Sequence, residues 1–251
     1  MKKPKVLVCS PQHESKMYCW EDWVKNVKNF TYPNFDVYLA DNSETDNNVN
    51  IIKSEGFFAD HTPRKHEKLL FHINDSHNQC RDFLLKNNYD YMFHLETDLF
   101  PPIDVIERLM FHDRDVISGT YDIFHGEERK LMIQEDEEYD KSIRSYRKIS
   151  YAEERESLFY NGKINKVYHA GIGCVLIKKH VIEKIPFRIV DNTMFHSDTW
   201  FSTDLSNLDI PYFVDSTIMC KHKNFTWLTK FDKSYNYDEI FDDNIKKGVK
   251  I

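Results

Sequence analysis

The stretch YDYMFHLETDLFPP, residues 89–102, decides the fold class because a run of core-forming side chains leads directly into two carboxylates and a double proline. The run is apolar on both faces at its start, as in a central strand that helices cover on either side. Side chains alternate along a strand, so Glu96 and Asp98 project to the same side if the strand stays extended that far. Pro101 and Pro102 end the strand pairing. The stretch therefore predicts a buried strand with two acids at its carboxyl end.

Strand and helix signals alternate along the chain before this stretch. Short runs of β-branched and aromatic residues predict strands, and a longer amphipathic segment predicts a helix. The predicted strands cover residues 5–11, 36–43 and 56–61, and the predicted helix covers 65–88. This order is typical of an α/β fold with a Rossmann-like, mainly parallel sheet flanked by helices. In such sheets ligands bind beyond the carboxyl ends of the strands, where both acids lie.

Composition limits the class of protein and of partner. A chain of 251 residues with 41% hydrophobic and 30% charged residues is expected to fold, and we favour one domain over residues 1–251 rather than two small ones. The formal net charge is −7, and no run of Lys and Arg forms a strip for a phosphate backbone. Nucleic acid is therefore a disfavoured partner.

Cysteine usage and hydropathy predict the compartment. The five cysteines are odd in number and scattered without CxxC spacing, which is typical of reduced thiols in a cytosolic protein. The apolar stretch near the N-terminus is too short for a signal peptide, and no window approaches the length of a membrane span. We therefore expect a cytoplasmic protein without a transmembrane segment.

The acid pair has a structural and a chemical interpretation. Acids at strand ends often solvate a loop or cap a helix, and Asp104 before VIERLMF is placed as such a cap. Two hard oxygen ligands at the end of a buried strand also suit Mg²⁺ or Mn²⁺, and such an ion in turn holds a diphosphate. The choice between the two depends on the residues that surround the pair.

The segment NQCRDFLLKNNYDYMFHLETD, residues 78–98, resembles the helix, turn, strand and acid motif of GT-A glycosyltransferases, especially family 2 and its relatives. In that family an Asp-any-Asp motif binds the metal of a nucleotide-sugar. Here the first acid is Glu96, so the resemblance implies direct ligation by Asp98 more strongly than by Glu96. Arg81 matches an arginine that often faces the nucleotide-sugar, although a solvated helical arginine is an equal alternative.

Two later segments keep the order of the same family. The segment 169–187 is similar to the acceptor side, where Gly171 and Gly173 would permit a close approach of sugar or acceptor to the backbone, or would simply begin a strand. In the segment 196–222, Asp198 matches the carboxylate that acts as general base in inverting enzymes; its alternative is a helix N-cap. His222 lies where many relatives complete the metal site, and histidine favours Mn²⁺ over Mg²⁺.

The first two predicted strand ends are the expected contacts of the nucleotide. Ser10, Pro11 and Gln12 close the first strand, and the loop ADNSETD with Asp41 resembles the family's acid-bearing loop that contacts base or ribose. A carboxylate there accepts hydrogen bonds from a base NH or a ribose hydroxyl. The same loop is also explained as an Asx-turn.

The resemblance covers residues 5–122 and 167–222 and implies a metal-dependent, inverting transfer of a sugar from a nucleotide-diphosphate sugar to an acceptor hydroxyl. A UDP-sugar is favoured over a GDP-sugar, and the acceptor stays unassigned. The alternatives are a nucleotidyltransferase, which normally has a glycine-rich loop after its first strand, and an inactive carbohydrate-binding or scaffold protein. An insertion at 125–163 is an acceptor loop, a lid or a solvated hairpin, and an aromatic tail at 223–251 covers the donor or packs on the core.

Overall fold

The computed structural model describes residues 3–125, 128–136, 139–140, 145–146, 149–151, 164–190, 193 and 195–223. The predicted insertion at 125–163 falls partly outside these ranges, and the predicted aromatic tail falls outside them beyond residue 223. The roles expected for both segments therefore stay predictions.

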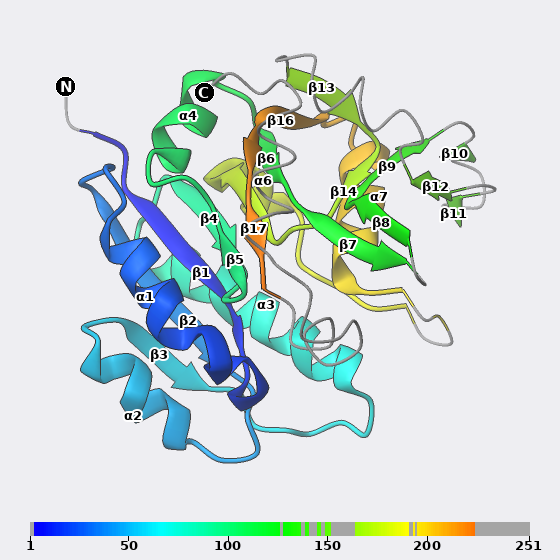
Figure 1. Ribbon diagram of the computed structural model, residues 1–251. Coiled ribbons are helices and arrows are strands. Elements are labelled where there is room, and N and C mark those ends of the chain that lie inside the picture. Colours follow the sequence, from blue (N-terminus) through cyan, green and yellow to red (C-terminus); the bar gives the residue numbers. More distant parts are fainter. Residues whose placement is uncertain are drawn as a thin grey trace.

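An eight-stranded sheet forms the centre of the described chain (Figure 1), with the strand order β13-β16-β6-β15-β4-β1-β2-β3. The strands β3, β2, β1 and β4 run parallel, as do β6 and β16, whereas β15 is antiparallel to both of its neighbours and β13 to β16. Their bounds are β1 Val6–Gln12, β2 Phe35–Asp41, β3 Phe58–His61, β4 Tyr91–Leu95, β6 Val116–Thr120, β13 Ile164–Val167, β15 Cys174–Lys178 and β16 Tyr212–Met219. This confirms the predicted α/β fold with a mixed, mainly parallel sheet.

Helices cover both faces of the sheet and explain why the central strand is apolar on each side (Figure 1). One face packs against α1 (Trp20–Lys28), α2 (Asn47–Ser54) and α4 (Val105–Phe111). The other face packs against α3 (Leu69–Lys86), α6 (Lys179–Lys184) and α7 (Ser197–Asn207). In β4, Phe93 belongs to the first core and Met92 to the second, and both are fully buried.

An apolar stripe holds α1 against the sheet. In α1 the buried residues are Trp20, Trp23, Val24 and Val27, which recur at the three- and four-residue spacing of one helix face. Full burial of each large side chain contributes roughly 1.5–3 kcal/mol of transfer free energy. Within the described residues, no helix combines the length and the apolar character that a membrane crossing requires.

The predicted element ends differ from the observed ones where a turn replaces regular structure. The helix predicted from residue 65 begins at Leu69. The strand predicted from residue 56 begins at Phe58, because Gly56 adopts a φ of 84° in the turn that follows α2. The central strand β4 ends at Leu95. Residues 97–98 form a turn, so the two acids follow the end of the strand as predicted, but the condition that the strand stays extended through both of them is not met.

Short elements complete the fold and bring distant segments to the acids. The remaining bounds are η1 Glu14–Cys19, β5 Leu99–Phe100, β7 Asp122–His125, β8 Glu128–Leu131, β9 Ile133–Asp136, β10 Tyr139–Asp140, β11 Ser145–Tyr146, β12 Ile149–Tyr151, β14 His169–Ala170 and β17 Lys221–His222. The strand β5 pairs antiparallel with β17, which places His222 opposite Leu99. The chain segment after β16 thus returns to the end of β4.

Candidate active site

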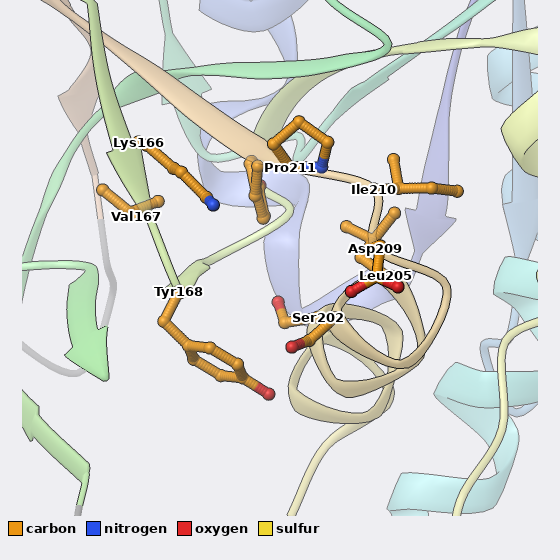
Figure 2. A pocket seen from close by; sticks show the side chains of 10 residues that line it. Lys166, Val167, Tyr168, Ser202, Leu205, Asp209, Ile210 and Pro211 are labelled. Carbon is orange, nitrogen blue, oxygen red and sulfur yellow. The ribbon is translucent and has the colours of Figure 1, made fainter. Parts of the chain in front are cut away.

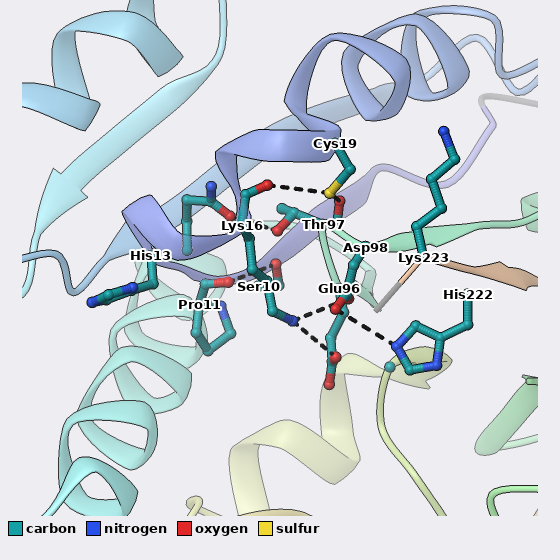
Figure 3. A network of polar contacts seen from close by, with 12 residues as sticks. Ser10, Pro11, His13, Lys16, Cys19, Glu96, Thr97, Asp98, His222 and Lys223 are labelled. Atoms are coloured by element: carbon teal, nitrogen blue, oxygen red, sulfur yellow. Dashed lines mark hydrogen bonds and ion pairs between the residues drawn. The ribbon is translucent and has the colours of Figure 1, made fainter. Parts of the chain in front are cut away.

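The acids at the end of β4 converge on a lysine that the sequence did not point to. Lys16, in η1 directly after β1, places its Nζ 3.2 Å from Glu96 Oε2 and 3.0 Å from Asp98 Oδ1 (Figure 3). The Asp98 residue is 3% exposed, whereas the Lys16 side chain keeps 31% of its surface accessible. An ammonium group therefore stands between two carboxylates at the sheet edge.

Three separate elements fix the backbone of the acidic turn. Its successive carbonyl groups each accept a hydrogen bond from a distant residue. Trp23 Nε1 donates to Glu96 O at 3.1 Å, Cys19 Sγ donates to Thr97 O at 3.2 Å, and the Lys223 backbone N–H donates to Asp98 O at 2.9 Å. Such satisfaction of buried carbonyls holds the two carboxylates in place before any ligand arrives.

His222 joins the cluster through β17. Its Nε2 lies 3.6 Å from Asp98 Oδ2, and its ring meets the edge of the Tyr121 ring at a centroid distance of 5.5 Å. The side chain of His222 is 8% exposed. Of the three residues expected as metal ligands, Asp98 therefore lies beside His222 and is linked to Glu96 through Lys16.

The electrostatics favour the ionised forms of both Lys16 and Asp98. Burial by itself raises the pKa of the Asp98 carboxyl, but the charge of Lys16 and the contact with His222 outweigh burial and hold that pKa below its usual range. Burial lowers the pKa of Lys16, and the charges of Glu96 and Asp98 more than reverse this, so the net shift is upward. The pair is charged at neutral pH.

The side-chain types in this cluster are ones that bind divalent ions in proteins. Within the described ranges, no group of three or more His, Cys, Asp and Glu side chains is arranged to hold a metal ion. Two carboxylates and an imidazole are nevertheless a donor set that suits Mn²⁺, and the Lys16 ammonium is a stand-in cation between the carboxylates. In this structure the Lys16 ammonium lies between the two carboxylates.

A cavity of about 360 Å³ opens beside this cluster and also reaches the first turn of α7. It is bounded by the ends of β1 and β2, the start of α3 and the start of α7. Its walls are Pro11, Gln12, His13, Ser15, Lys16, Asn42, Leu69, Ile73, His77, Glu96, Ile172, His196, Ser197 and Asp198. Glu96 and Asp198, 102 positions apart in the chain, therefore face one space.

Asp198 lies in the first turn of α7 but is not its N-cap, because the cap position is His196. One carboxylate oxygen, Oδ1, accepts a hydrogen bond from the Thr199 backbone N–H at 2.7 Å. A carboxylate at this end of a helix is stabilised by the helix dipole. Asp198 thus lies in the wall of the cavity, and the N-cap interpretation is wrong.

Buried histidines support the start of α7. His77 Nδ1 is 2.7 Å from Ser197 Oγ, His94 Nδ1 donates to Ile172 O at 2.6 Å, and the two rings meet at a centroid distance of 5.0 Å. Burial lowers the pKa of both imidazoles, that of His94 to about 4. These side chains position the wall of the cavity without adding positive charge near Asp198 at neutral pH.

The side chain of Tyr121 occupies the space beside the two glycines that were expected to allow a ligand close to the backbone. A Cβ atom on Gly171 would overlap the Tyr121 hydroxyl, and one on Gly173 would lie 2.5 Å from Leu99 Cδ1 and 2.9 Å from the Tyr121 ring. The Tyr121 hydroxyl also accepts a hydrogen bond from the Gly173 N–H at 3.2 Å. The expectation of a close sugar or acceptor approach at these glycines is therefore corrected, because a buried aromatic side chain occupies that space.

Replacing Gly171 by alanine is expected to destabilise the protein by about 1–3 kcal/mol, because the new methyl group overpacks the space that Tyr121 fills. Urea unfolding of Gly171→Ala and of Gly171→Ala/Tyr121→Phe checks this. The double variant should lose less stability than the sum of the single changes, since one overlapping atom is removed. Strict additivity would contradict the assigned contact.

Some of the residues expected to contact the nucleotide line the cavity, and the others are buried behind its wall. Pro11 and Gln12 line the cavity, whereas Ser10 is fully buried behind it. Asp41 is also fully buried, and its carboxylate accepts a hydrogen bond from Ser43 Oγ at 2.7 Å, so it braces the loop after β2. The neighbouring Asn42 forms the wall in its place.

Arg81 does not face the cavity as expected. Its Nε donates to Ile182 O at 2.8 Å and its Nη2 to Glu183 O at 3.1 Å. These acceptors are carbonyl groups near the C-terminal end of α6, which attract a guanidinium group. Arg81 thus joins α3 to α6, and its assignment to the donor is corrected.

A larger cavity of about 680 Å³ lies elsewhere, between β13 and the C-terminal part of α7 (Figure 2). Lys166 and Tyr168 form one side, and Ser202, Asp209 and Pro211 are on the other. None of the predicted site residues lines it. The candidate site is therefore the smaller cavity, where carboxylates, a lysine and the first turn of α7 meet.

Comparisons with known proteins identify the fold. No protein-family model matches the sequence, and no curated protein matches it. Among solved structures, S. aureus TarS 1–349 in complex with UDP-GlcNAc is 9% identical over 97% of this chain and 66% of that chain, with a TM-score of 0.56. A second structure of TarS 1–349 is 12% identical over 86% and 60% of the two chains, with a TM-score of 0.50.

A197 from STIV is 16% identical over 88% of this chain and 86% of that chain, with a TM-score of 0.48. The chain spans less than two thirds of TarS 1–349. The likeness to TarS 1–349 extends over nearly the whole chain and confirms the expected α/β fold, with a mixed, mainly parallel sheet flanked by helices.

Proposed function

We propose that this protein is a glycosyltransferase that moves a sugar from a nucleotide-diphosphate sugar to an acceptor hydroxyl, with inversion at the anomeric carbon. One observation carries the proposal: the charged cluster of Lys16 and Glu96 and the carboxylate of Asp198 line the same cavity. Inverting transfer needs a charge-stabilising group for the leaving diphosphate and a base for the incoming hydroxyl. We take residues 1–251 as one catalytic domain.

The acidic turn is the donor side of the proposed site. Asp98, Glu96 and His222 would hold a Mn²⁺ or Mg²⁺ ion, which neutralises charge on the departing diphosphate when bound. The apolar side chains of Leu69 and Ile73 offer a surface for the base. Asn42 Oδ1 is buried without a hydrogen-bond partner among the described residues, so it is available to accept from a base N–H.

Asp198 is the proposed general base. Its carboxylate takes the proton of the acceptor hydroxyl while the oxygen bonds to the anomeric carbon and the bond from that carbon to the diphosphate breaks. The diphosphate leaves with the electron pair. The bound UDP-GlcNAc of TarS supports a nucleotide-sugar donor here, and we favour UDP over GDP. Nucleotidyl transfer is less favoured because residues 13–19, which follow β1, contain no glycine.

A screen of nucleotide-sugars with Mn²⁺ tests this function. UDP-GlcNAc, other UDP-sugars and GDP-sugars are added to the protein, and thermal unfolding and nucleotide release are followed. A donor present at 100 times its Kd should add about 2.7 kcal/mol to the free energy of unfolding. The same sugars without Mn²⁺ are the control. If none of the nucleotide-sugars stabilises the protein in the presence of Mn²⁺, the proposal is contradicted.

A further inference from the structure

Lys16 occupies the position between the two carboxylates that the proposed function gives to a divalent ion. Its Nζ is 3.0 Å from Asp98 Oδ1 and 3.2 Å from Glu96 Oε2. We propose that Lys16 is an internal counter-ion that holds this position in the donor-free protein and is displaced when a divalent ion and the nucleotide diphosphate bind together. This inference rests on the proposed function and adds a reason why ion and nucleotide bind as a unit.

The charges explain why the exchange needs both ligands. Glu96 and Asp98 carry two negative charges and Lys16 one positive charge, so the cluster keeps one net negative charge. An entering divalent ion neutralises the carboxylates but leaves the ammonium without its partners. A nucleotide diphosphate supplies new negative charge for that ammonium. The ion alone should therefore bind weakly, and ion and nucleotide should strengthen each other's binding.

The local structure allows the ammonium to move while the backbone stays in place. The Lys16 N–H donates to His13 O at 2.9 Å, and Lys16 O accepts from Cys19 Sγ at 3.1 Å. Cys19 in turn donates to Thr97 O, so η1 is tied to the acidic turn. The flexible Lys16 side chain lines the cavity and is 31% exposed. Rotation of its side-chain bonds can turn Nζ from the carboxylates toward the cavity.

Lys223 provides a matched control in the same neighbourhood. Its backbone N–H contacts Asp98 O, but its side chain pairs with Asp22 and points away from the carboxylates (Figure 3). Lys223→Met therefore removes the same charge as Lys16→Met without emptying the position between Glu96 and Asp98. A difference in Mn²⁺ affinity between these two variants is therefore due to the charge between Glu96 and Asp98 rather than to the net charge of the protein.

The test is a titration of the nucleotide-free protein with Mn²⁺ alone, followed by the electron paramagnetic resonance of free Mn²⁺. Lys16→Met is expected to bind Mn²⁺ at least about tenfold more tightly than wild type, because the competing ammonium is gone. Lys223→Met should stay within about twofold of wild type. Adding Asp98→Asn to Lys16→Met should abolish the gain. Lys16→Gln, with Gln as a neutral polar residue, is a second variant for the same measurement.

A parallel titration with UDP at saturating Mn²⁺ completes the test. The Lys16→Met variant should bind UDP about tenfold more weakly than wild type, since the released ammonium no longer contacts the diphosphate. Unchanged or weaker Mn²⁺ affinity in both Lys16 variants, including no binding at all, overturns the exchange. If wild type still binds and cleaves a nucleotide-sugar in that case, the proposed function stands and Lys16 is a permanent cation of the site.

Discussion

The Asp98→Asn variant is expected to lose UDP binding in the presence of Mn²⁺ by on the order of 10²-fold or more. The reason is the position of the carboxylate. It is almost fully buried, it pairs with Lys16, and it lies beside His222, so it holds the internal cation and is the central ligand of the proposed metal site. Asparagine keeps the size of the side chain but removes its charge. Calorimetry with UDP and Mn²⁺ measures the loss.

Asp215 offers a matched control for this change. It is 4% exposed, and its carboxylate pairs with His112 Nε2 at 3.0 Å, so it resembles Asp98 in burial and in having a histidine partner. It lies on β16 against α4 and pairs with His112 rather than with Lys16 or His222. Asp215→Asn should lower stability without changing the affinity for UDP. Equal affinities in Asp98→Asn and wild type would move Asp98 to a structural role.

Changing Asp198 to asparagine is expected to separate binding from chemistry. The amide keeps the size and much of the hydrogen bonding of the carboxylate but cannot accept the acceptor's proton. Donor affinity should therefore survive, while transfer falls by on the order of 10²-fold or more. Donor hydrolysis should fall less, because water attacks without the exact position of an acceptor hydroxyl. Donor affinity and single-turnover transfer to an identified acceptor are the two measurements.

Asp204 on the same helix is the control for Asp198. Its carboxylate is held by Arg188 at 2.7 and 2.8 Å and does not line the cavity. Asp204→Asn should therefore leave transfer close to wild type. Full transfer by Asp198→Asn would remove Asp198 from the reaction. Loss of donor affinity by a folded Asp198→Asn protein would place this residue on the donor side instead.

The sequence predicts the frame of the fold because burial leaves a local pattern. The central strand β4 is apolar on both faces, and this follows from the two helical layers that cover it. The direction of β15 is not predictable in this way, since a strand that runs antiparallel to β4 has the same side-chain alternation as a parallel one. The likeness of the fold to TarS confirms the frame and leaves the residue roles to experiment.

The parts of the site that the sequence missed are contacts between distant residues. Lys16 reaches Glu96 across 80 positions, and Tyr121 fills the space beside Gly171 from 50 positions away. The spacing of residue types along a short stretch of sequence does not predict a contact between residues so far apart. The glycines were a signal for a close approach, but they do not state whether a ligand or a side chain makes it. Arg81 was misassigned for the same reason, because its carbonyl partners on α6 are about a hundred residues later.

The cavity beside the acidic turn is proposed to bind and cleave a nucleotide-sugar. The most direct test is the release of UDP from UDP-sugars, with UDP-GlcNAc among them, measured by chromatography for wild type and Asp98→Asn with and without Mn²⁺. Wild type with Mn²⁺ is expected to release UDP, and Asp98→Asn is expected to lose this release by on the order of 10²-fold. Equal release by both proteins, or no release from any UDP- or GDP-sugar by wild type, would contradict this proposal.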